Sequence, residues 1–173
     1  MMTLISGGAG SGKSAFAEEL ALRSGAPRRC YLATMAVWGE EDRARVARHR
    51  AMRRGKGFVT LERQRDLRGL RVPADSVVLL EDLCNLTANE CFGPAGFDGA
   101  AERILAGLDA VSAQCRDLIV VTNELFSDGH AYPAETRRYL ELLADLNRAL
   151  AARSERVAEV AAGLPILWKG ELK

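Results

Sequence analysis

The residues with the clearest chemical potential lie in a glycine-rich stretch near the start of the chain. They are Gly7, Gly8, Ala9, Gly10, Ser11, Gly12, Lys13 and Ser14. This stretch satisfies the pattern G-x-x-x-x-G-K-[ST], in which the glycines let successive backbone N–H groups turn inward around phosphate oxygens. Lys13 would bring a positive charge to the β- and γ-phosphates, and Ser14 would offer its hydroxyl to Mg²⁺. We therefore predict a loop that holds a nucleoside triphosphate together with Mg²⁺.

Part of the same stretch also fits a second phosphate-binding pattern. Residues 10–15 satisfy G-x-G-x-x-[GA], which is typical of dinucleotide-binding proteins. That pattern requires an acidic residue at the end of the second strand, about 20 residues further on. The second expected strand ends at Thr34 and Met35, which are not acidic. The triphosphate interpretation is therefore favoured, and the absence of an N-K-x-D sequence argues against a switch GTPase.

An acidic residue closes a strongly apolar run at residues 77–81, V-V-L-L-E. A continuous aliphatic and β-branched run of this length is typical of a strand buried on both faces. A carboxylate at the end of such a strand could complete the Mg²⁺ shell beside the phosphate loop. The residues alone leave open whether Glu81 or Asp82 does so.

Basic residues crowd a third segment and surround a single histidine, His49. They are Arg43, Arg45, Arg48, Arg50, Arg53, Arg54 and Lys56. On a helix, Arg45, His49 and Arg53 lie four residues apart and share one face. Cationic neighbours disfavour the imidazolium, so the ring would stay neutral and nucleophilic near pH 7, and the arginines could neutralise a triphosphate during attack on its α-phosphorus. A solvated basic face and a nucleic-acid contact remain alternatives.

Short apolar runs predict strands, and segments rich in helix formers predict helices between them. The expected strands are residues 3–6, 30–34, 58–62, 77–81 and 118–121, with two more between 157 and 168. The expected helices are residues 14–24, 40–54 and 133–153, and one capped by Asp98 with apolar positions at Ile104, Leu105, Leu108 and Val111. This alternation predicts an α/β fold with a mostly parallel sheet, and the last two strands allow an antiparallel edge pair.

Size and composition narrow the class of protein. A chain of 173 residues with 48% hydrophobic and 27% charged residues suits a single domain over residues 1–173. The four cysteines form no C-x-x-C pair, which favours free thiols in a reducing compartment. No apolar stretch approaches the roughly 20 residues of a membrane span, and the N-terminus lacks the pattern of a signal peptide. We therefore expect a cytoplasmic protein.

Six sequence blocks occur in one order along the chain. They are GGAGSGKS at 7–14, YLAT at 31–34, R-V-x-x-H at 45–49, T-x-E at 60–62, VVLLE at 77–81 and VTNE at 121–124. Together they resemble the adenosylcobinamide kinase/adenosylcobinamide-phosphate guanylyltransferase family of cobalamin biosynthesis. The resemblance implies a RecA-like P-loop fold and a homotrimer. It also implies a bifunctional enzyme that phosphorylates adenosylcobinamide and then transfers GMP from GTP to the product through a guanylylated histidine.

The resemblance also implies a role for individual residues. His49 would be the guanylylated histidine, and residues 7–14 would hold the nucleotide phosphates. Further nucleotide contacts would come from Thr34, Arg50, Arg53, Glu62 and Glu81. Ser14 and Glu81 would hold Mg²⁺, the nucleotide would be GTP, and ATP could also serve as phosphoryl donor. The expected partners are small molecules and further copies of the chain, without nucleic acid or a membrane span.

One segment departs from the family pattern. After VTNE the family continues V-G-x-G-x-V-P, whereas this chain has LFSDGHAYP at 125–133. A divergent member that keeps only the kinase activity is therefore an alternative. A second alternative is a RecA-like ATPase whose basic helix contacts nucleic acid, with binding that depends steeply on salt. The net charge of +1 and the 6% aromatic content argue against it.

Overall fold

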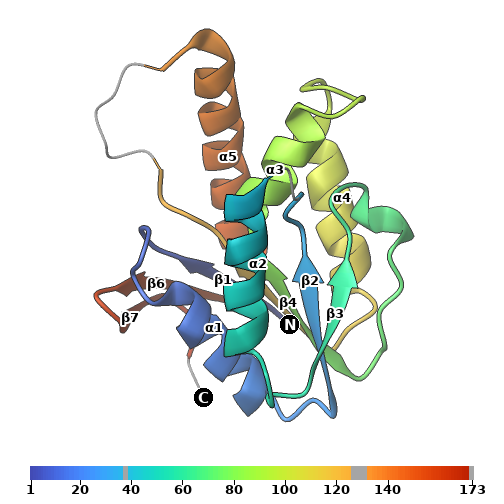
Figure 1. Ribbon diagram of the computed structural model, residues 1–173, viewed down its shortest axis with the longest axis vertical. Helices are drawn as coiled ribbons and strands as arrows, with labels where there is room; N and C mark the ends of the chain where they lie inside the picture. The colour runs from blue at the N-terminus through green and yellow to red at the C-terminus, as the bar shows by residue number, and fades with distance from the viewer. Residues whose placement is uncertain (37–38, 126–131, 172–173) are drawn as a thin grey trace.

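A seven-stranded sheet forms the centre of the molecule in the computed structural model, which describes residues 1–36, 39–125 and 132–171 (Figure 1). The strands are β1 (Met2–Ser6), β2 (Arg28–Ala33), β3 (Phe58–Glu62), β4 (Ser76–Glu81), β5 (Asp117–Val121), β6 (Arg156–Ala161) and β7 (Leu164–Lys169). Their order across the sheet is β3-β2-β4-β5-β1-β6-β7. All neighbours pair in parallel except β6 and β7, which pair antiparallel. The predicted mostly parallel sheet with an antiparallel edge is confirmed.

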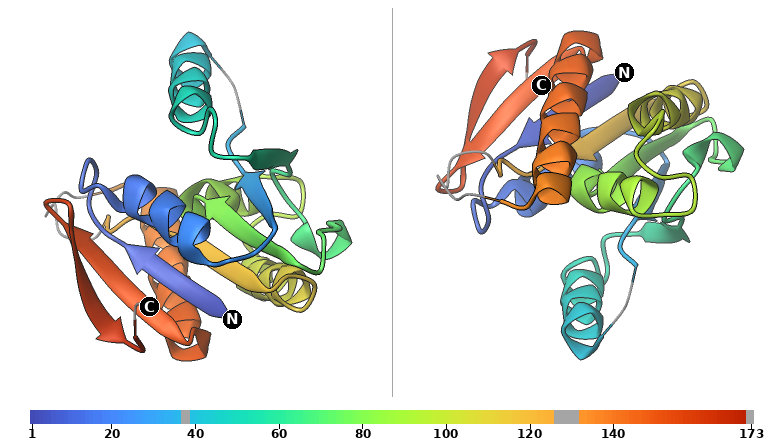
Figure 2. Two further views of the ribbon diagram at one scale, coloured as in Figure 1. Left: turned by 90° about the horizontal axis from the view of Figure 1, so that it is seen from below. Right: turned by 90° about the horizontal axis from the view of Figure 1, so that it is seen from above.

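Helices cover both faces of this sheet. They are α1 (Lys13–Arg23), α2 (Glu40–Met52), α3 (Leu83–Cys91), α4 (Ala100–Ser112) and α5 (Ala134–Arg153), with a short 3-10 helix at Leu67–Gly69. Figure 2 shows α3, α4 and α5 against one face and α1 against the other, while α2 stands away from the sheet on the α1 side. Residues of α2, β2, β3 and β4 line a pocket between that helix and the sheet.

The core explains why the central strands were easy to predict. In β4, Val78 and Leu80 pack beneath α3, α4 and α5, whereas Val77 and Leu79 pack on the side of α1. Successive side chains of a strand point to opposite faces, so a strand covered on both sides must be apolar at every position. All four side chains are fully buried.

Helix α3 was not predicted from the sequence. It starts directly after β4, and its N-cap is Asp82, whose side chain accepts a hydrogen bond of 2.7 Å from the backbone N–H of Asn85. The segment is short and contains Asn85 and Thr87, which are weak helix formers. Besides this cap, the burial of Leu83 and Leu86 stabilises the helix.

The expected cap of α4 was wrong. The N-cap is Gly99, not Asp98, and its backbone is left-handed with φ of 68°. Glycine adopts that conformation without a steric cost, which aspartate does not. The Asp98 side chain instead pairs with Arg138 of α5 at 2.8 Å.

Trp38, His130 and most of the divergent segment at 125–133 lie outside the described part of the chain. None of the helices in the described ranges is long and apolar enough to cross a membrane.

Candidate nucleotide site

The glycine-rich loop connects the end of β1 to the start of α1, at the edge of the sheet where the parallel strands end. In an open α/β sheet this carboxyl edge is where ligands bind. Gly12 is the N-cap of α1 and has a left-handed backbone with φ of 93°. The Lys13 side chain is buried, and its Nζ donates to the carbonyl of Gly8 at 3.1 Å. The lysine side chain therefore folds back onto the backbone of the loop that is expected to bind phosphates.

The turn between β6 and β7 supports this loop from behind. The backbone N–H of Gly163 donates to the carbonyl of Ser11 at 2.8 Å. A Cβ at Gly12 would lie 3.2 Å from the Cα of Gly163, and a Cβ at Gly7 would lie 2.5 Å from the carbonyl oxygen of Val160. A Cβ at Gly7 would thus clash with neighbouring backbone, and one at Gly12 would make an unusually tight contact with it.

Glu81 joins three parts of the site through its two carboxylate oxygens. Oε1 accepts a hydrogen bond from the hydroxyl of Ser14 and lies 3.6 Å from Nδ1 of His49. Oε2 accepts a hydrogen bond of 3.2 Å from the hydroxyl of Tyr31. Of the two acids left open by the sequence, Glu81 contacts the phosphate loop, whereas Asp82 caps α3 and accepts a further hydrogen bond from Asn123 at 3.0 Å.

The environment of Glu81 favours its ionised form. Burial by itself would raise the pKa of this carboxyl group, but the interactions with His49, Ser14 and Tyr31 outweigh that effect. The net result is a pKa below the ordinary value for glutamate. An anion is thus held between the phosphate loop and the histidine.

His49 reaches this carboxylate from α2, across the space between that helix and the sheet. Its Nδ1 is buried and makes no hydrogen bond within the described residues. Its side chain lines a pocket of about 330 Å³ together with Arg50, Arg53, Glu62 and Glu81, so five predicted site residues are brought together there. The neighbours of His49 in the sequence are mostly cationic, whereas the tertiary structure also brings the Glu81 carboxylate beside its imidazole.

The two predicted arginines occupy different positions in this pocket. Arg50 lies at the exposed rim, where it pairs with Glu62 at 2.9 Å. Arg53 is only 7% exposed, and its guanidinium carbon lies 3.2 Å from the centre of the Tyr31 ring. Its Nη1 makes no hydrogen bond within the described residues. Arg53 therefore holds a buried positive charge beside the pocket with a donor still unused.

Thr34 contributes differently from the other predicted residues. Its side chain is fully buried, and its hydroxyl donates to the carbonyl of Asp82 at 2.9 Å. Its own carbonyl accepts a hydrogen bond of 2.7 Å from the amide of Asn89. The Thr34 hydroxyl thus links the end of β2 to the end of β4, and the Thr34 side chain does not line the pocket.

The polar lining residues that were not assigned to the site from the sequence are Tyr31, Thr60, Gln64 and Asn85. Tyr31 lies within the quoted YLAT block, and its polar hydroxyl inside an apolar strand was the available signal. Asn85 lies on the helix that was not predicted. Gln64 follows β3 and carries no local signal of a site.

The oxygen donors present suit Mg²⁺. The Ser14 hydroxyl and the Glu81 carboxylate lie side by side, and Mg²⁺ typically takes one or two protein oxygens, with waters and substrate phosphates filling the remaining positions. Within residues 1–36, 39–125 and 132–171 there is no cluster of three or more His, Cys, Asp or Glu that would form an all-protein metal site. The donor set therefore fits a metal bound together with a nucleotide.

Together the fold and site define a P-loop nucleotide-binding protein of the RecA-like class, as predicted. Solved structures with the same fold include the flagellar accessory protein FlaH from Methanocaldococcus jannaschii, with a TM-score of 0.53 and 11% identity over 98% of this chain and 78% of that one. A protein from Pyrococcus horikoshii OT3 has a TM-score of 0.55 and 9% identity over 98% of this chain and 86% of that one. At these identities the likeness shows the fold alone.

Comparison of sequences shows the family. The model for "Cobinamide kinase / cobinamide phosphate guanyltransferase" matches residues 3–167. The bifunctional adenosylcobalamin biosynthesis protein CobP of Pseudomonas aeruginosa is 38% identical over 99% of both chains. The corresponding protein CobU of Escherichia coli is 29% identical over 98% of this chain and 100% of its own. The chain belongs to this family of transferases, which confirms the resemblance noted in the sequence.

Proposed function

We propose that this protein phosphorylates adenosylcobinamide and then transfers a guanylyl group from GTP to the product through His49. The observation that carries the proposal is the contact of Glu81 with both Ser14 of the phosphate loop and Nδ1 of His49. It links the triphosphate-binding element to the only histidine in the pocket lining of the described chain. The names of the related proteins agree with both activities.

In the guanylyl transfer, His49 acts as the nucleophile. With Nδ1 turned toward the Glu81 carboxylate, the proton resides on Nδ1 and the lone pair on Nε2. Nε2 attacks the α-phosphorus of GTP, a P–N bond forms, and pyrophosphate leaves with the electrons of the broken P–O bond. A phosphate oxygen of cobinamide phosphate then attacks the same phosphorus, and the imidazole leaves. The buried charge of Arg53 stabilises the negative charge that develops on the phosphoryl oxygens.

In the kinase step, the phosphate loop holds the donor nucleotide. The hydroxyl oxygen of the aminopropanol arm attacks the γ-phosphorus and its proton passes to solvent. The bond to the β-phosphate oxygen breaks, and the nucleoside diphosphate leaves with the electrons of that bond. Ser14 and Glu81 would hold Mg²⁺, which supplies neutralisation of the phosphate charges when bound. GTP is the proposed donor, and ATP could also serve. The proposed nucleotide contacts outside the phosphate loop are Thr34, Arg50, Arg53, Glu62 and Glu81.

The proposal also includes the assembly and location of the protein. We infer a homotrimer, as the family resemblance implies, and the exposed apolar side chains of β7 offer a contact surface for another copy. We infer a cytoplasmic location because all four cysteines are free thiols, which suits a reducing compartment.

Labelling with α-³²P GTP in the absence of a corrinoid tests the covalent step. Wild type should acquire a label that is lost in acid and retained in alkali, as expected for a phosphoramidate. The variant His49→Ala should lose the label completely, while His130→Ala, which removes the only other histidine of the chain, should keep it. An unlabelled wild type that still phosphorylates cobinamide would exclude the histidine route.

The kinase-only alternative rests on the divergent segment after Glu124, of which residues 126–131 lie outside the described chain. It predicts that cobinamide phosphate accumulates and that GDP-cobinamide never forms, a distinction that chromatography of the reaction products makes directly. The nucleic-acid-binding alternative is not retained, because the family is shown and the Arg50 and Arg53 side chains line the pocket.

A further inference from the structure

A second groove, which none of the steps above uses, opens beside the nucleotide pocket. Its volume is about 840 Å³. One wall comes from the turn after β3, with Gln64 and Arg65, and the other from the end of α3, with Asn89, Phe92 and Gly93. Gln64 lines both the groove and the pocket. The two spaces are therefore neighbours on one surface.

One face of α3 leads from the pocket into the groove. Asn85 lines the pocket, whereas Ala88, Asn89 and Phe92 line the groove. These positions follow the i, i+3, i+4, i+7 spacing of a single helix face. At a rise of 1.5 Å per residue, the stripe is about 10 Å long. An extended ligand can thus lie along α3 and occupy both spaces.

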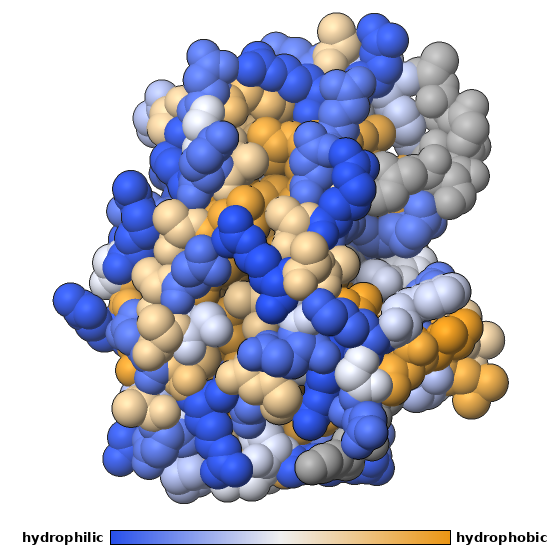
Figure 3. Space-filling model, turned by 180° about the vertical axis from the view of Figure 1, so that it is seen from behind, coloured by the Kyte–Doolittle hydropathy of each residue, from blue (hydrophilic) through white to orange (hydrophobic). Residues whose placement is uncertain are grey.

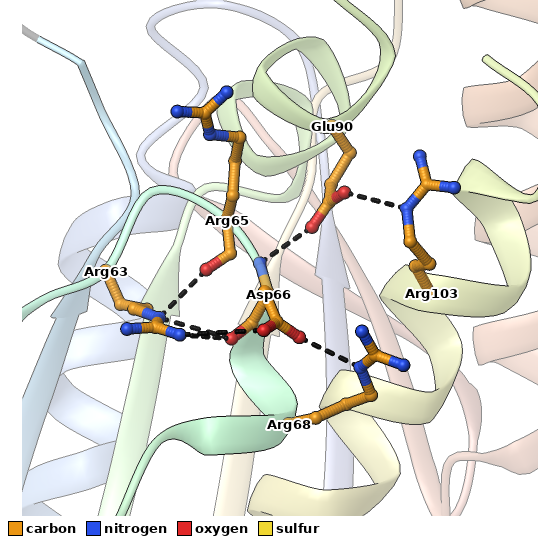
Figure 4. Close-up of polar contacts among 6 residues, drawn as sticks. All are labelled: Arg63, Arg65, Asp66, Arg68, Glu90 and Arg103. Atoms are coloured by element: carbon orange, nitrogen blue, oxygen red, sulfur yellow. Dashed lines mark hydrogen bonds and ion pairs between the residues drawn. The ribbon is translucent and has the colours of Figure 1, made fainter. Parts of the chain in front are cut away.

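Hydrogen bonds fix the backbone at Arg65, whereas its guanidinium group makes none within the described residues. The carbonyl of Arg65 accepts a hydrogen bond of 2.9 Å from Nε of Arg63, and the N–H of Asp66 donates to the buried Glu90 at 2.7 Å. Arg103 pairs with the same Glu90 at 3.1 Å. Figure 4 shows the Arg65 side chain extending away from this network, with only its carbonyl engaged among the residues drawn.

Gly93 makes room for this arginine. A Cβ at Gly93 would lie 2.6 Å from Nη1 of Arg65 and 2.5 Å from the carbonyl oxygen of Asn89. Among the described residues, no hydrogen bond or ion pair engages the Arg65 guanidinium. Its five N–H donors are therefore free for a ligand that carries carbonyl or phosphate oxygens.

Phe92 supplies the apolar part of the groove. It is 58% exposed, which is unusual for a phenylalanine, and its ring stands edge-on against Phe97 with centroids 5.2 Å apart. Tyr139 lies on another side of the same ring, at 6.2 Å. The ring is thus supported by two aromatic neighbours while much of its surface faces solvent. An exposed aromatic ring next to a free guanidinium suits a large apolar ligand with an amide periphery.

We propose that this space, which we name the acceptor groove, binds the corrin ring of cobinamide and of cobinamide phosphate. Phe92 contacts the apolar macrocycle, and Arg65 donates hydrogen bonds to the carbonyls of its peripheral amides. The aminopropanol arm then extends along α3 past Asn85 toward Glu81 and His49. This inference rests on the proposed function for the identity of the ligand.

Direct binding of cobinamide tests the groove without any catalytic step. The corrin absorbs visible light, so equilibrium dialysis of the intact protein gives the Kd. Arg65→Ala and Phe92→Ala should each raise this Kd at least tenfold, and both should still acquire the guanylyl label at the wild-type rate within twofold. Two matched controls should change neither quantity. They are Arg116→Ala, at the amino ends of the parallel strands, and Leu22→Ala, on α1.

The two measurements separate the possible failures. Unchanged cobinamide Kd values in both variants would overturn the acceptor groove, whatever the labelling shows. Variants that lose the label together with cobinamide binding would also overturn it, because the residues would then belong to the nucleotide site or to the fold. A wild type that binds cobinamide but acquires no label would leave the groove standing and reject the covalent step of the proposed function.

Discussion

Tyr31 contacts two charged side chains of the pocket, Glu81 and Arg53. Its hydroxyl donates to Glu81 at 3.2 Å, and its ring lies 3.2 Å beneath the guanidinium carbon of the buried Arg53. Burial, assisted by the nearby Glu81 carboxylate, raises the pKa of the phenol, so it stays protonated and remains a donor. One residue therefore orients the carboxylate that faces His49 and also supports the cation expected to meet the phosphates.

The two roles of Tyr31 can be separated by substitution. Tyr31→Phe removes only the hydrogen bond, which is worth about 1 kcal/mol, so the rate of His49 labelling at saturating GTP should fall about fivefold. Tyr31→Ala also removes the ring beneath Arg53 and should reduce the rate at least tenfold further. Equal rates for the two variants would show that the hydroxyl accounts for the whole effect and that the ring is not needed. Single-turnover labelling makes the comparison.

Helix α2 differs from the other helices in the interactions that fix its position. It is strongly polar, and its described side chains are mostly exposed. Figure 2 shows it standing off the sheet. Its C-terminal end is held by His49 and Arg53 above the pocket, and just after it Lys56 pairs with the buried Glu18 of α1. The helix that carries the proposed nucleophile is thus fixed by charges rather than by an apolar face.

The Lys56–Glu18 pair provides a test of that conclusion. Lys56→Met leaves the Glu18 carboxylate, which is 1% exposed, without its counter-charge. We expect the free energy of unfolding to fall by about 2 kcal/mol, below the usual loss for a fully buried pair because Lys56 is partly exposed. The double variant Glu18→Gln with Lys56→Met should recover most of the loss, because no charge then remains buried. Urea denaturation measures both, and simple additivity of the two single changes would contradict the pairing.

At the scale of the whole molecule, the sheet ends on one side in an apolar strand. Leu164, Ile166 and Trp168 alternate along β7, so they share one face, and Leu164 and Trp168 are 70% and 68% exposed. Figure 3 shows apolar residues gathered at this edge, at the lower right. The exposure of Trp168 places its side chain outside the core of this chain. Exposed edge strands and apolar patches of this kind are typical sites of association with another chain.

Substitution on this face tests the proposed assembly. Light scattering coupled to gel filtration should show the wild type as a trimer, and Ile166→Lys should shift it to the monomer, because a buried lysine would oppose the contact. Val59→Lys, on the exposed surface of the opposite edge strand β3, is the matched control and should leave the mass unchanged. A monomeric wild type at micromolar concentration would contradict self-association through β7.

Much of the fold and part of the site could be predicted from short stretches of the chain. The loop at residues 7–14 needs glycines and a lysine in adjacent positions, and the run at 77–81 needs apolar side chains on both faces. Each requirement is met by neighbours in the sequence, so each leaves a local pattern. The same holds for the block around His49, which carries the family resemblance.

Other features depend on contacts between distant segments, and only the tertiary structure decided them. Helix α3 exists because its apolar side chains are buried beneath β4, and Gly99 rather than Asp98 starts α4 because the backbone there is left-handed. The contacts of Glu81 with Ser14, His49 and Tyr31 form because β2, β4, α1 and α2 meet at one edge of the sheet. The sequence by itself determined which chemical groups are present and which local backbone they favour. Their pairing across 30 to 70 residues was decided by packing, because that information lies in the shared core and not in any single segment.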